Sequence, residues 1–124
     1  MKLNLHTLLQ VYEVLKLLHY QTTKGFHHTT YDEALEDLME LTDTFIETYL
    51  GIYGRDWKVG ISAGLILPPN NMKACVDRYK EVVLDTVVPH LYEVAGARRP
   101  LRKLAEDYEQ AAEKYYGLLK NFEQ

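Results

Sequence analysis

The stretch HYQTTKGFHHTTYDEALEDLMELTDTFIE, residues 19–47, holds most of the imidazole and acidic side chains that lie close to a helical apolar face. Four residues of this stretch follow the spacing H-x3-D-x10-D-x3-E: His28, Asp32, Asp43 and Glu47. On an α-helix that turns by about 100° per residue, the four fall within an arc of roughly 100°. The spacing therefore predicts one stripe of metal-ligand side chains along one helix. His19 lies nine residues ahead of this stripe.

The apolar side chains of the same segment predict the buried face of that helix. They occupy the arc next to the acidic stripe: Tyr31, Leu35, Leu38, Thr42, Phe45, Ile46 and Tyr49. The stripe therefore borders the core. A second interpretation is a solvated acidic helix face, in which Asp32 and Glu33 occupy a first turn where the helix dipole favours acids.

The separation of the two halves of the stripe limits how they can bind metal. Asp32 and Asp43 are 11 residues apart, so their Cα atoms lie roughly 16 Å apart along a helix that rises about 1.5 Å per residue. One ion cannot contact both carboxylates on one chain. Either the two halves are unrelated, or two copies of the helix run antiparallel about a two-fold axis. In that case His28 and Asp32 of one chain meet Asp43 and Glu47 of the other, and symmetry forms the pairing twice.

The pattern His19, His28-x3-Asp32-x10-Asp43-x3-Glu47 resembles the ferroxidase site of the Dps-type mini-ferritins, the DNA-binding proteins from starved cells. The resemblance covers roughly residues 3–54 by motif and the rest by helix pattern. It implies that two His and an Asp of one subunit face an Asp and a Glu of its two-fold mate. It also implies that the metal is iron and that Fe(II) is oxidised by peroxide or oxygen, in iron storage or detoxification.

Three features differ from the usual pattern of that family. The loop between His19 and His28 is shorter, Tyr20 stands where the family usually has Trp, and the chain is short. The sequence is most similar to small, phage-borne Dps-like domains. We therefore expect a cytoplasmic protein of a bacterium or a phage-infected host cell.

Length and composition predict a single domain over residues 1–124. The chain has 124 residues and 47% hydrophobic content, enough to bury a core without disulfides or a structural zinc. Its single Cys75 cannot form an internal disulfide, which favours a reducing compartment. The apolar N-terminus, residues 1–18, is broken by polar side chains and lacks a small-residue cleavage site. We expect a cytosolic helix there and no membrane span.

Apolar periodicity predicts four helices, at about residues 3–23, 30–53, 71–93 and 100–122. The expected fold is all-α: a ferritin-like four-helix bundle with a long crossover, about residues 54–71, between the second and third helices. The crossover contains the apolar run VGISAGLIL, residues 59–67, which we expect to cover one end of the bundle or to form a subunit contact.

Local signals set the expected helix ends. Gly25 breaks the first helix, and Thr30 followed by Glu33 is a capping-box signature for the second. The connection between these two helices is short, so they should pack antiparallel and bring His19 close to His28. Pro89 is expected to kink the third helix or to end it early.

The remaining acids and histidines indicate no second metal site. The chain contains no Glu-x-x-His motif, which a site inside one ferritin bundle would need on two helices. A second group of acids and imidazole is interpreted as solvated charge: Asp77, Glu81, Asp85 and His90. Mixed imidazole and carboxylate ligands suit Fe(II), Mn(II) or Zn(II) and do not select among them.

Charge argues against nucleic acid as a partner. The formal net charge is −4, and the one basic patch would meet the negative field of the other residues. That patch is Arg98, Arg99, Arg102 and Lys103. The expected partner is a second copy of the chain, in a two-fold dimer built on the first two helices or in a larger cage.

A metal-free oligomeric bundle is the alternative from a different functional class. It would act as a structural or protein-interaction module, for example in a phage. The ten tyrosines fit it, because exposed aromatic side chains favour protein interfaces. Five of them lie on the first two predicted helices: Tyr12, Tyr20, Tyr31, Tyr49 and Tyr53.

Overall fold

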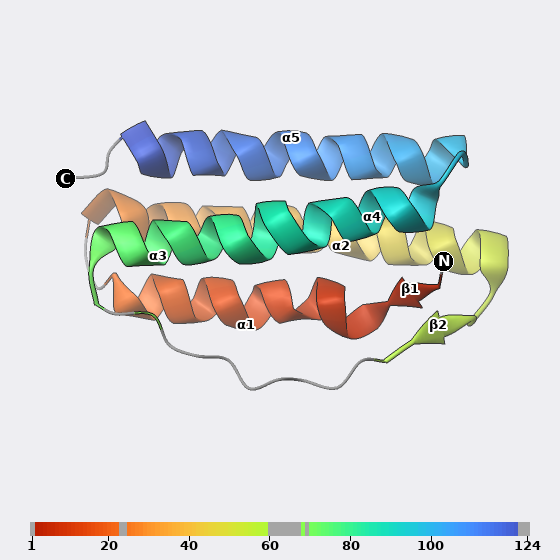
Figure 1. Cartoon of the computed structure of the whole chain (residues 1–124), viewed down its shortest axis with the longest axis horizontal. Helices are drawn as coiled ribbons and strands as arrows, with labels where there is room; N and C mark the ends of the chain where they lie inside the picture. The colour runs from red at the N-terminus through yellow and green to blue at the C-terminus, as the bar shows by residue number, and fades with distance from the viewer. Residues whose placement is uncertain (1, 23–24, 60–67, 69, 122–124) are drawn as a thin grey trace.

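The structure is a computed structural model that describes residues 2–22, 25–59, 68 and 70–121. Over these residues the chain forms four helical rods and one short pair of strands (Figure 1). The elements are β1 (Leu3–Asn4), α1 (Leu5–Gln21), α2 (Gly25–Tyr53), β2 (Trp57–Lys58), α3 (Met72–Tyr79), the π-helix η1 (Lys80–Val87), α4 (Val88–Ala95) and α5 (Arg99–Asn121). The prediction of an all-α chain is confirmed.

Helix α1 begins and ends at side chains that satisfy its terminal backbone groups. The Oδ1 of Asn4 accepts a hydrogen bond from the backbone N–H of Thr7, which caps the first turn. At the other end, the hydroxyl of Thr22 donates to the carbonyl of Leu18 at 2.9 Å. The helix buries Leu8, Val11, Val14, Leu15 and Leu18 along one face. Tyr12 of the same helix is 51% exposed.

Helix α2 begins at Gly25, five residues before the predicted start. Gly25 has a φ of 87°, a conformation open mainly to glycine, so the chain reverses there and enters the helix at once. The prediction that Thr30 and Glu33 form a capping box is wrong. The hydroxyl of Thr30 instead donates to the carbonyl of Phe26 at 2.7 Å inside the helix. Two side chains of this extra turn, His27 and Thr30, are each only 2% exposed.

The third rod runs through α3, η1 and α4 without a break, from Met72 to Ala95. We expected Pro89 to kink or end this helix, but the helix continues past it. The change in backbone lies ahead of the proline, in the π-helical turns of η1, where the N–H of Val88 bonds to the carbonyl of Val83. The wider turns suit a ring that has no N–H to donate and that would crowd a preceding carbonyl in an α-helix.

The connection after α2 joins two rods that run in the same direction. Helix α1 lies antiparallel to α2, as their short connection predicts, whereas α3 runs parallel to α2 (Figure 1). The connection starts at the strand pair, where Leu3 lies opposite Trp57. It ends at the other end of α1, where the Nε2 of Gln21 donates to the carbonyl of Pro68 at 2.7 Å. Residues 60–67, most of the apolar run in the predicted crossover, lie outside the described residues.

The core fills the space between the four rods with one continuous cluster of apolar side chains. Its largest fully buried members include Tyr31, Tyr79, Tyr108 and Phe45. The hydroxyl of Tyr79 donates to the carbonyl of Ala112 at 2.9 Å, which satisfies a polar group in the middle of the bundle. Among the described helices, none has both the length and the apolar character that crossing a membrane requires.

Candidate metal centre

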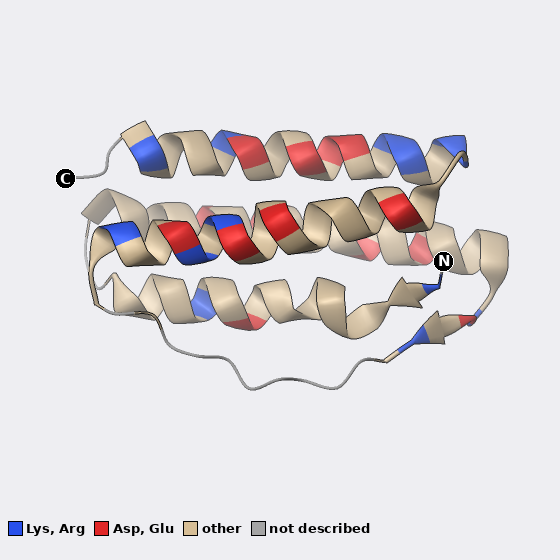
Figure 2. Cartoon of the chain, in the orientation of Figure 1, with Lys and Arg blue, Asp and Glu red and all other residues tan. Residues whose placement is uncertain are grey.

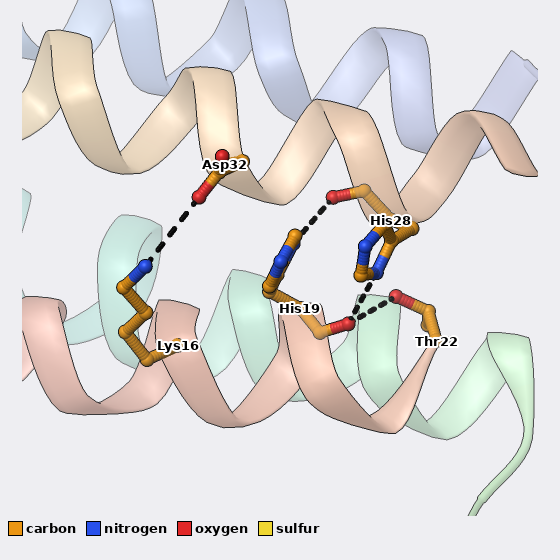
Figure 3. Close-up of polar contacts among 5 residues, drawn as sticks. All are labelled: Lys16, His19, Thr22, His28 and Asp32. Atoms are coloured by element: carbon orange, nitrogen blue, oxygen red, sulfur yellow. Dashed lines mark hydrogen bonds and ion pairs between the residues drawn. The ribbon is translucent and has the colours of Figure 1, made fainter. Parts of the chain in front are cut away.

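The imidazoles of His19 and His28 join the end of α1 to the beginning of α2 (Figure 3). The Nδ1 of His19 lies 2.8 Å from the backbone carbonyl of His28, and the Nδ1 of His28 lies 2.7 Å from the carbonyl of His19. The two rings are stacked, with centroids 3.7 Å apart and planes inclined by 21°. We call this reciprocal pair the histidine clasp.

The clasp fixes which nitrogen of each ring carries the proton. A carbonyl oxygen can only accept a hydrogen bond, so each Nδ1 must carry a hydrogen and donate it. In the neutral imidazole, Nε2 then has a free lone pair. Neither Nε2 has a hydrogen-bond partner within the part of the chain that the structure describes. A backbone carbonyl that holds Nδ1–H is also a common way in which proteins orient a histidine that binds metal through Nε2.

The clasp has a structural role as well. The carbonyl of His19 lies in the last turn of α1, where carbonyls lack partners within the helix. It accepts from the Nδ1 of His28 and more weakly, at 3.4 Å, from the hydroxyl of Thr22. The clasp therefore both caps α1 and holds two half-buried imidazoles side by side.

Asp32 lies one turn beyond His28 and faces a lysine of α1. Its Oδ1 is 3.7 Å from the Nζ of Lys16 (Figure 3), and the Asp32 side chain is 54% exposed. This ion pair bridges α1 and α2 beside the clasp. A metal ion that binds Asp32 therefore has to compete with the ammonium group of Lys16. The spacing of the predicted motif does not indicate this ion pair.

Asp43 and Glu47 lie farther along α2, one helical turn apart, and both are exposed. Neither forms an ion pair with another described residue. The structure thus brings together His19 and His28, places Asp32 next to them with Lys16, and leaves Asp43 and Glu47 on a separate part of the same helix. Across the described residues of one chain, no three or more His, Cys, Asp or Glu side chains gather closely enough to hold a metal ion.

His27 is the buried histidine of this region, and the motif did not single it out. Its side chain is 2% exposed and packs against the ring of Tyr31, with centroids 6.2 Å apart. Neither ring nitrogen has a hydrogen-bond partner among the described residues. On the helical wheel His27 falls at the same angle as the buried Phe45, a signal from which its burial was predictable.

The acids of the third rod act as solvated charge, as the sequence predicts. Lys73 pairs with Asp77 at 2.9 Å, and Lys80 pairs with Asp85 at 3.0 Å. His90 does not join them. Its Nε2 accepts a hydrogen bond of 3.1 Å from the backbone N–H of Asn4. Burial lowers the pKa of His90, although Glu93 acts in the opposite direction.

The outer surface of α1 carries several exposed apolar side chains. Leu9, Tyr12 and Tyr20 are 45%, 51% and 64% exposed, and at spacings of three and eight they fall on one side of the helix. Tyr53, at the end of α2, is also exposed, whereas Tyr31 and Tyr49 are buried in the core. Phe26 of α2 is also 45% exposed, so exposed aromatic side chains lie on both α1 and α2.

Comparison with known proteins finds no matching family model, no matching curated protein and no matching solved structure.

Proposed function

We propose that the chain is a Dps-like, ferritin-fold protein that binds and oxidises Fe(II) at a site shared by two copies of itself. Two features of the backbone support a ferritin-like bundle. The rods α2 and α3 run in the same direction, and the connection between them extends from the start of α1 to its end. One long crossover of this kind distinguishes ferritin-like bundles from simple up-and-down bundles.

The histidine clasp is the observation that carries the proposal. It holds two imidazoles in the tautomer that leaves Nε2 available, at the boundary between α1 and α2 where solvent can reach them. Two neutral nitrogen donors next to a carboxylate suit Fe(II), Mn(II) or Zn(II). The resemblance of the motif selects iron, so Fe(II) is the proposed substrate.

The ligands that one chain lacks are proposed to come from a second copy. Asp43 and Glu47 are exposed on the same stripe of α2 as Asp32, and neither forms an ion pair with another described residue. Antiparallel packing of two α2 helices about a two-fold axis would place them opposite the clasp of the other chain. The exposed Leu9, Tyr12 and Tyr20 of α1 supply apolar surface for such an interface.

Each group then has a defined task in Fe(II) oxidation. Each Nε2 can donate its lone pair to an incoming Fe(II) ion in the plane of its own ring, and the clasp keeps both rings from rotating away. Asp32 contributes negative charge once its ion pair with Lys16 is broken. Asp43 and Glu47 of the second copy add two carboxylates, which favour the more highly charged ferric product. Peroxide or oxygen accepts the electrons.

Metal analysis combined with a solution mass tests this function. We expect the mass of a dimer or a multiple of it, with Fe(II), Mn(II) or Zn(II) bound under anaerobic conditions. His28→Ala and Glu47→Gln should each remove the bound metal. Glu113→Gln, which alters an exposed carboxylate of α5, is the matched control and should leave the metal content unchanged. A monomer without bound metal would contradict the proposal.

A metal-free interaction module remains the second candidate, and two observations favour it. Lys16 already neutralises Asp32, and the clasp already serves to cap α1. On this account the exposed face of α1 still mediates self-association, but His28→Ala changes only stability. The metal content of the wild-type chain therefore separates the two functions.

A further inference from the structure

The charges of this chain are divided strongly between one end of the bundle and the remainder. Residues 1–4, 54–59 and 96–103 contain seven of the 14 Lys and Arg and one of the 18 Asp and Glu. The remaining residues hold seven basic and 17 acidic side chains. The net charge is therefore +6 for the first group of segments and −10 for the remaining residues. We call the seven basic residues the basic pole: Lys2, Arg55, Lys58, Arg98, Arg99, Arg102 and Lys103.

The segments of the basic pole lie together in space although they are far apart in sequence. β1 pairs with β2, and the turn between α4 and α5 lies at the same end of the bundle (Figure 2). Lys2 and Tyr53 line the same surface hollow of about 260 Å3, and the guanidinium of Arg98 lies 5.8 Å from the centre of the Tyr53 ring. Lys2 and Arg98, which come from different segments, therefore both lie next to Tyr53.

The arginines of the pole have no carboxylate partners among the described residues. Arg55, Arg98 and Arg99 are exposed and form no ion pair there, and Arg102 instead donates to the carbonyl of Gly96 at 3.2 Å. The lysines of the pole differ from its arginines, because Lys2 pairs with Asp56 and Lys103 pairs with Asp107. Guanidinium groups bind carboxylates with two parallel hydrogen bonds, so unpaired arginines at one pole indicate an acidic partner.

A surface with the complementary charge exists on this same chain, between α2 and α5. A recess of about 250 Å3 is lined by Asp37, Glu40, Leu41 and Ala111. We call it the acidic recess. Neither carboxylate has an ion-pair partner among the described residues, although Asp37 accepts a hydrogen bond from the hydroxyl of Tyr115.

Further charges surround the acidic recess. The pKa of Tyr115 is raised first by burial, next by Asp37, and then by Glu33 and Glu36. Several acids therefore act on this part of the surface. One lysine of the chain, Lys114, lies beside it, with its Nζ 5.1 Å from the centre of the Tyr115 ring. The carboxylates of the recess outnumber this single cation.

We propose that the basic pole of one copy docks its Arg98 and Arg99 into the acidic recess of a second copy. The guanidinium groups would pair with Asp37 and Glu40, and their methylene stems would pack on Leu41 and Ala111. The contact uses two different surfaces, so it is heterologous and each added copy leaves one pole and one recess open. It is separate from the proposed two-fold contact at α1 and α2, and together the two contacts would build assemblies larger than a dimer.

Sedimentation of mixed charge-reversal variants tests this contact. In about 50 mM salt, where exposed charges act over more than 10 Å, the wild-type chain should form species larger than a dimer and lose them at about 500 mM salt. Arg98→Glu with Arg99→Glu, and separately Glu40→Lys, should each abolish the large species. Mixing the two variants should restore association, because the intact pole of the Glu40→Lys chain can dock into the intact recess of the double arginine variant. Both variants should keep the metal content of the wild type, so this test is independent of the proposed metal site.

A matched control separates a specific contact from a general effect of net charge. Lys73→Glu with Lys80→Glu changes the net charge by the same amount as the double arginine variant but leaves pole and recess intact. This control should still form large species at low salt. The proposal is overturned by large species that persist at high salt, by loss of them in the control, or by no rescue on mixing. It is also overturned if the pole binds double-stranded DNA while the chain shows no salt-dependent self-association.

Discussion

The imidazole rings of His19 and His28 stack with centroids 3.7 Å apart, and each Nδ1 donates to the backbone carbonyl of the other residue. This arrangement ties the last turn of α1 to the first turns of α2 and sets the tautomer of both rings. Stability at this end of the bundle therefore depends on this pair of side chains, which are also the proposed metal ligands.

His28→Phe separates the hydrogen bond of the clasp from its stacking. Phenylalanine can still stack on His19 but cannot donate to the carbonyl of His19, so we expect a loss of about 1 kcal/mol in the free energy of unfolding. Denaturant unfolding measures this loss. His6→Phe is the control, because His6 is a half-buried histidine of α1 outside the clasp. Equal losses in both variants would show that the hydrogen bond contributes nothing.

Lys16→Gln should strengthen metal binding. The ammonium of Lys16 lies 3.7 Å from the Oδ1 of Asp32, so its removal frees that carboxylate for a metal ion. We expect up to about fivefold tighter binding, the equivalent of an exposed ion pair worth at most about 1 kcal/mol. Calorimetric titration with Mn(II) measures the change. Weaker binding in this variant would mean that Asp32 is not a ligand.

The hydrogen bond from Asn4 to His90 should respond to acid. Burial lowers the pKa of His90 below the ordinary 6.5, and only the neutral ring can accept the N–H of Asn4. The stabilisation is therefore present above pH 6.5 and disappears as the pH falls through the lowered pKa of the folded state. Amide exchange of Asn4, compared with that of core amides, measures this loss. His90→Gln keeps an acceptor without a titrating ring, and its Asn4 exchange should show no such step.

His27→Leu should stabilise the bundle. Both ring nitrogens of His27 are buried and have no hydrogen-bond partner in the part of the chain that the structure describes. Burying such polar atoms costs free energy that an apolar side chain does not cost. We expect a gain of about 1 kcal/mol and a rise in Tm of about 4 °C. Thermal unfolding followed by circular dichroism tests this gain, with His6→Leu as the control. A fall in Tm would show that the imidazole of His27 makes a stabilising interaction that leucine cannot replace.

Regular patterns in the sequence predicted the helices well, and exceptions to local rules caused the errors. Apolar spacing located α1, α2, α5 and the third rod within a few residues, because burying one face dominates where helices form. The start of α2 was misplaced because Gly25 allows an abrupt reversal, so Thr30 is not needed as a cap. The π-helical turns of η1 ahead of Pro89 were not predicted, because such turns depend on packing.

The candidate site was predictable only in part for a similar reason. The short connection between the first two helices predicted that His19 and His28 meet, and they do. Lys16 lies on a different helix from the motif, so its pairing with Asp32 required the folded arrangement. The bond from Asn4 to His90 joins residues 86 positions apart, and no local pattern reports it.

The central claim is that two chains complete one metal site, and a mixture of two inactive variants tests it most directly. His28→Ala damages the half of the site that holds the clasp, and Glu47→Gln damages the half contributed by the other chain. In a dimer with one copy of each variant, both lesions fall in the same one of the two symmetric sites, so the other site is intact.

The decisive measurement is the metal content and Fe(II) oxidation of the two variants, alone and after they are refolded together. We predict that each variant alone binds no metal and that the mixed dimer, isolated by two different affinity tags, binds half of the wild-type amount and oxidises Fe(II). Full metal content in either variant alone, or no recovery in the isolated mixed dimer, would contradict a site shared between two chains.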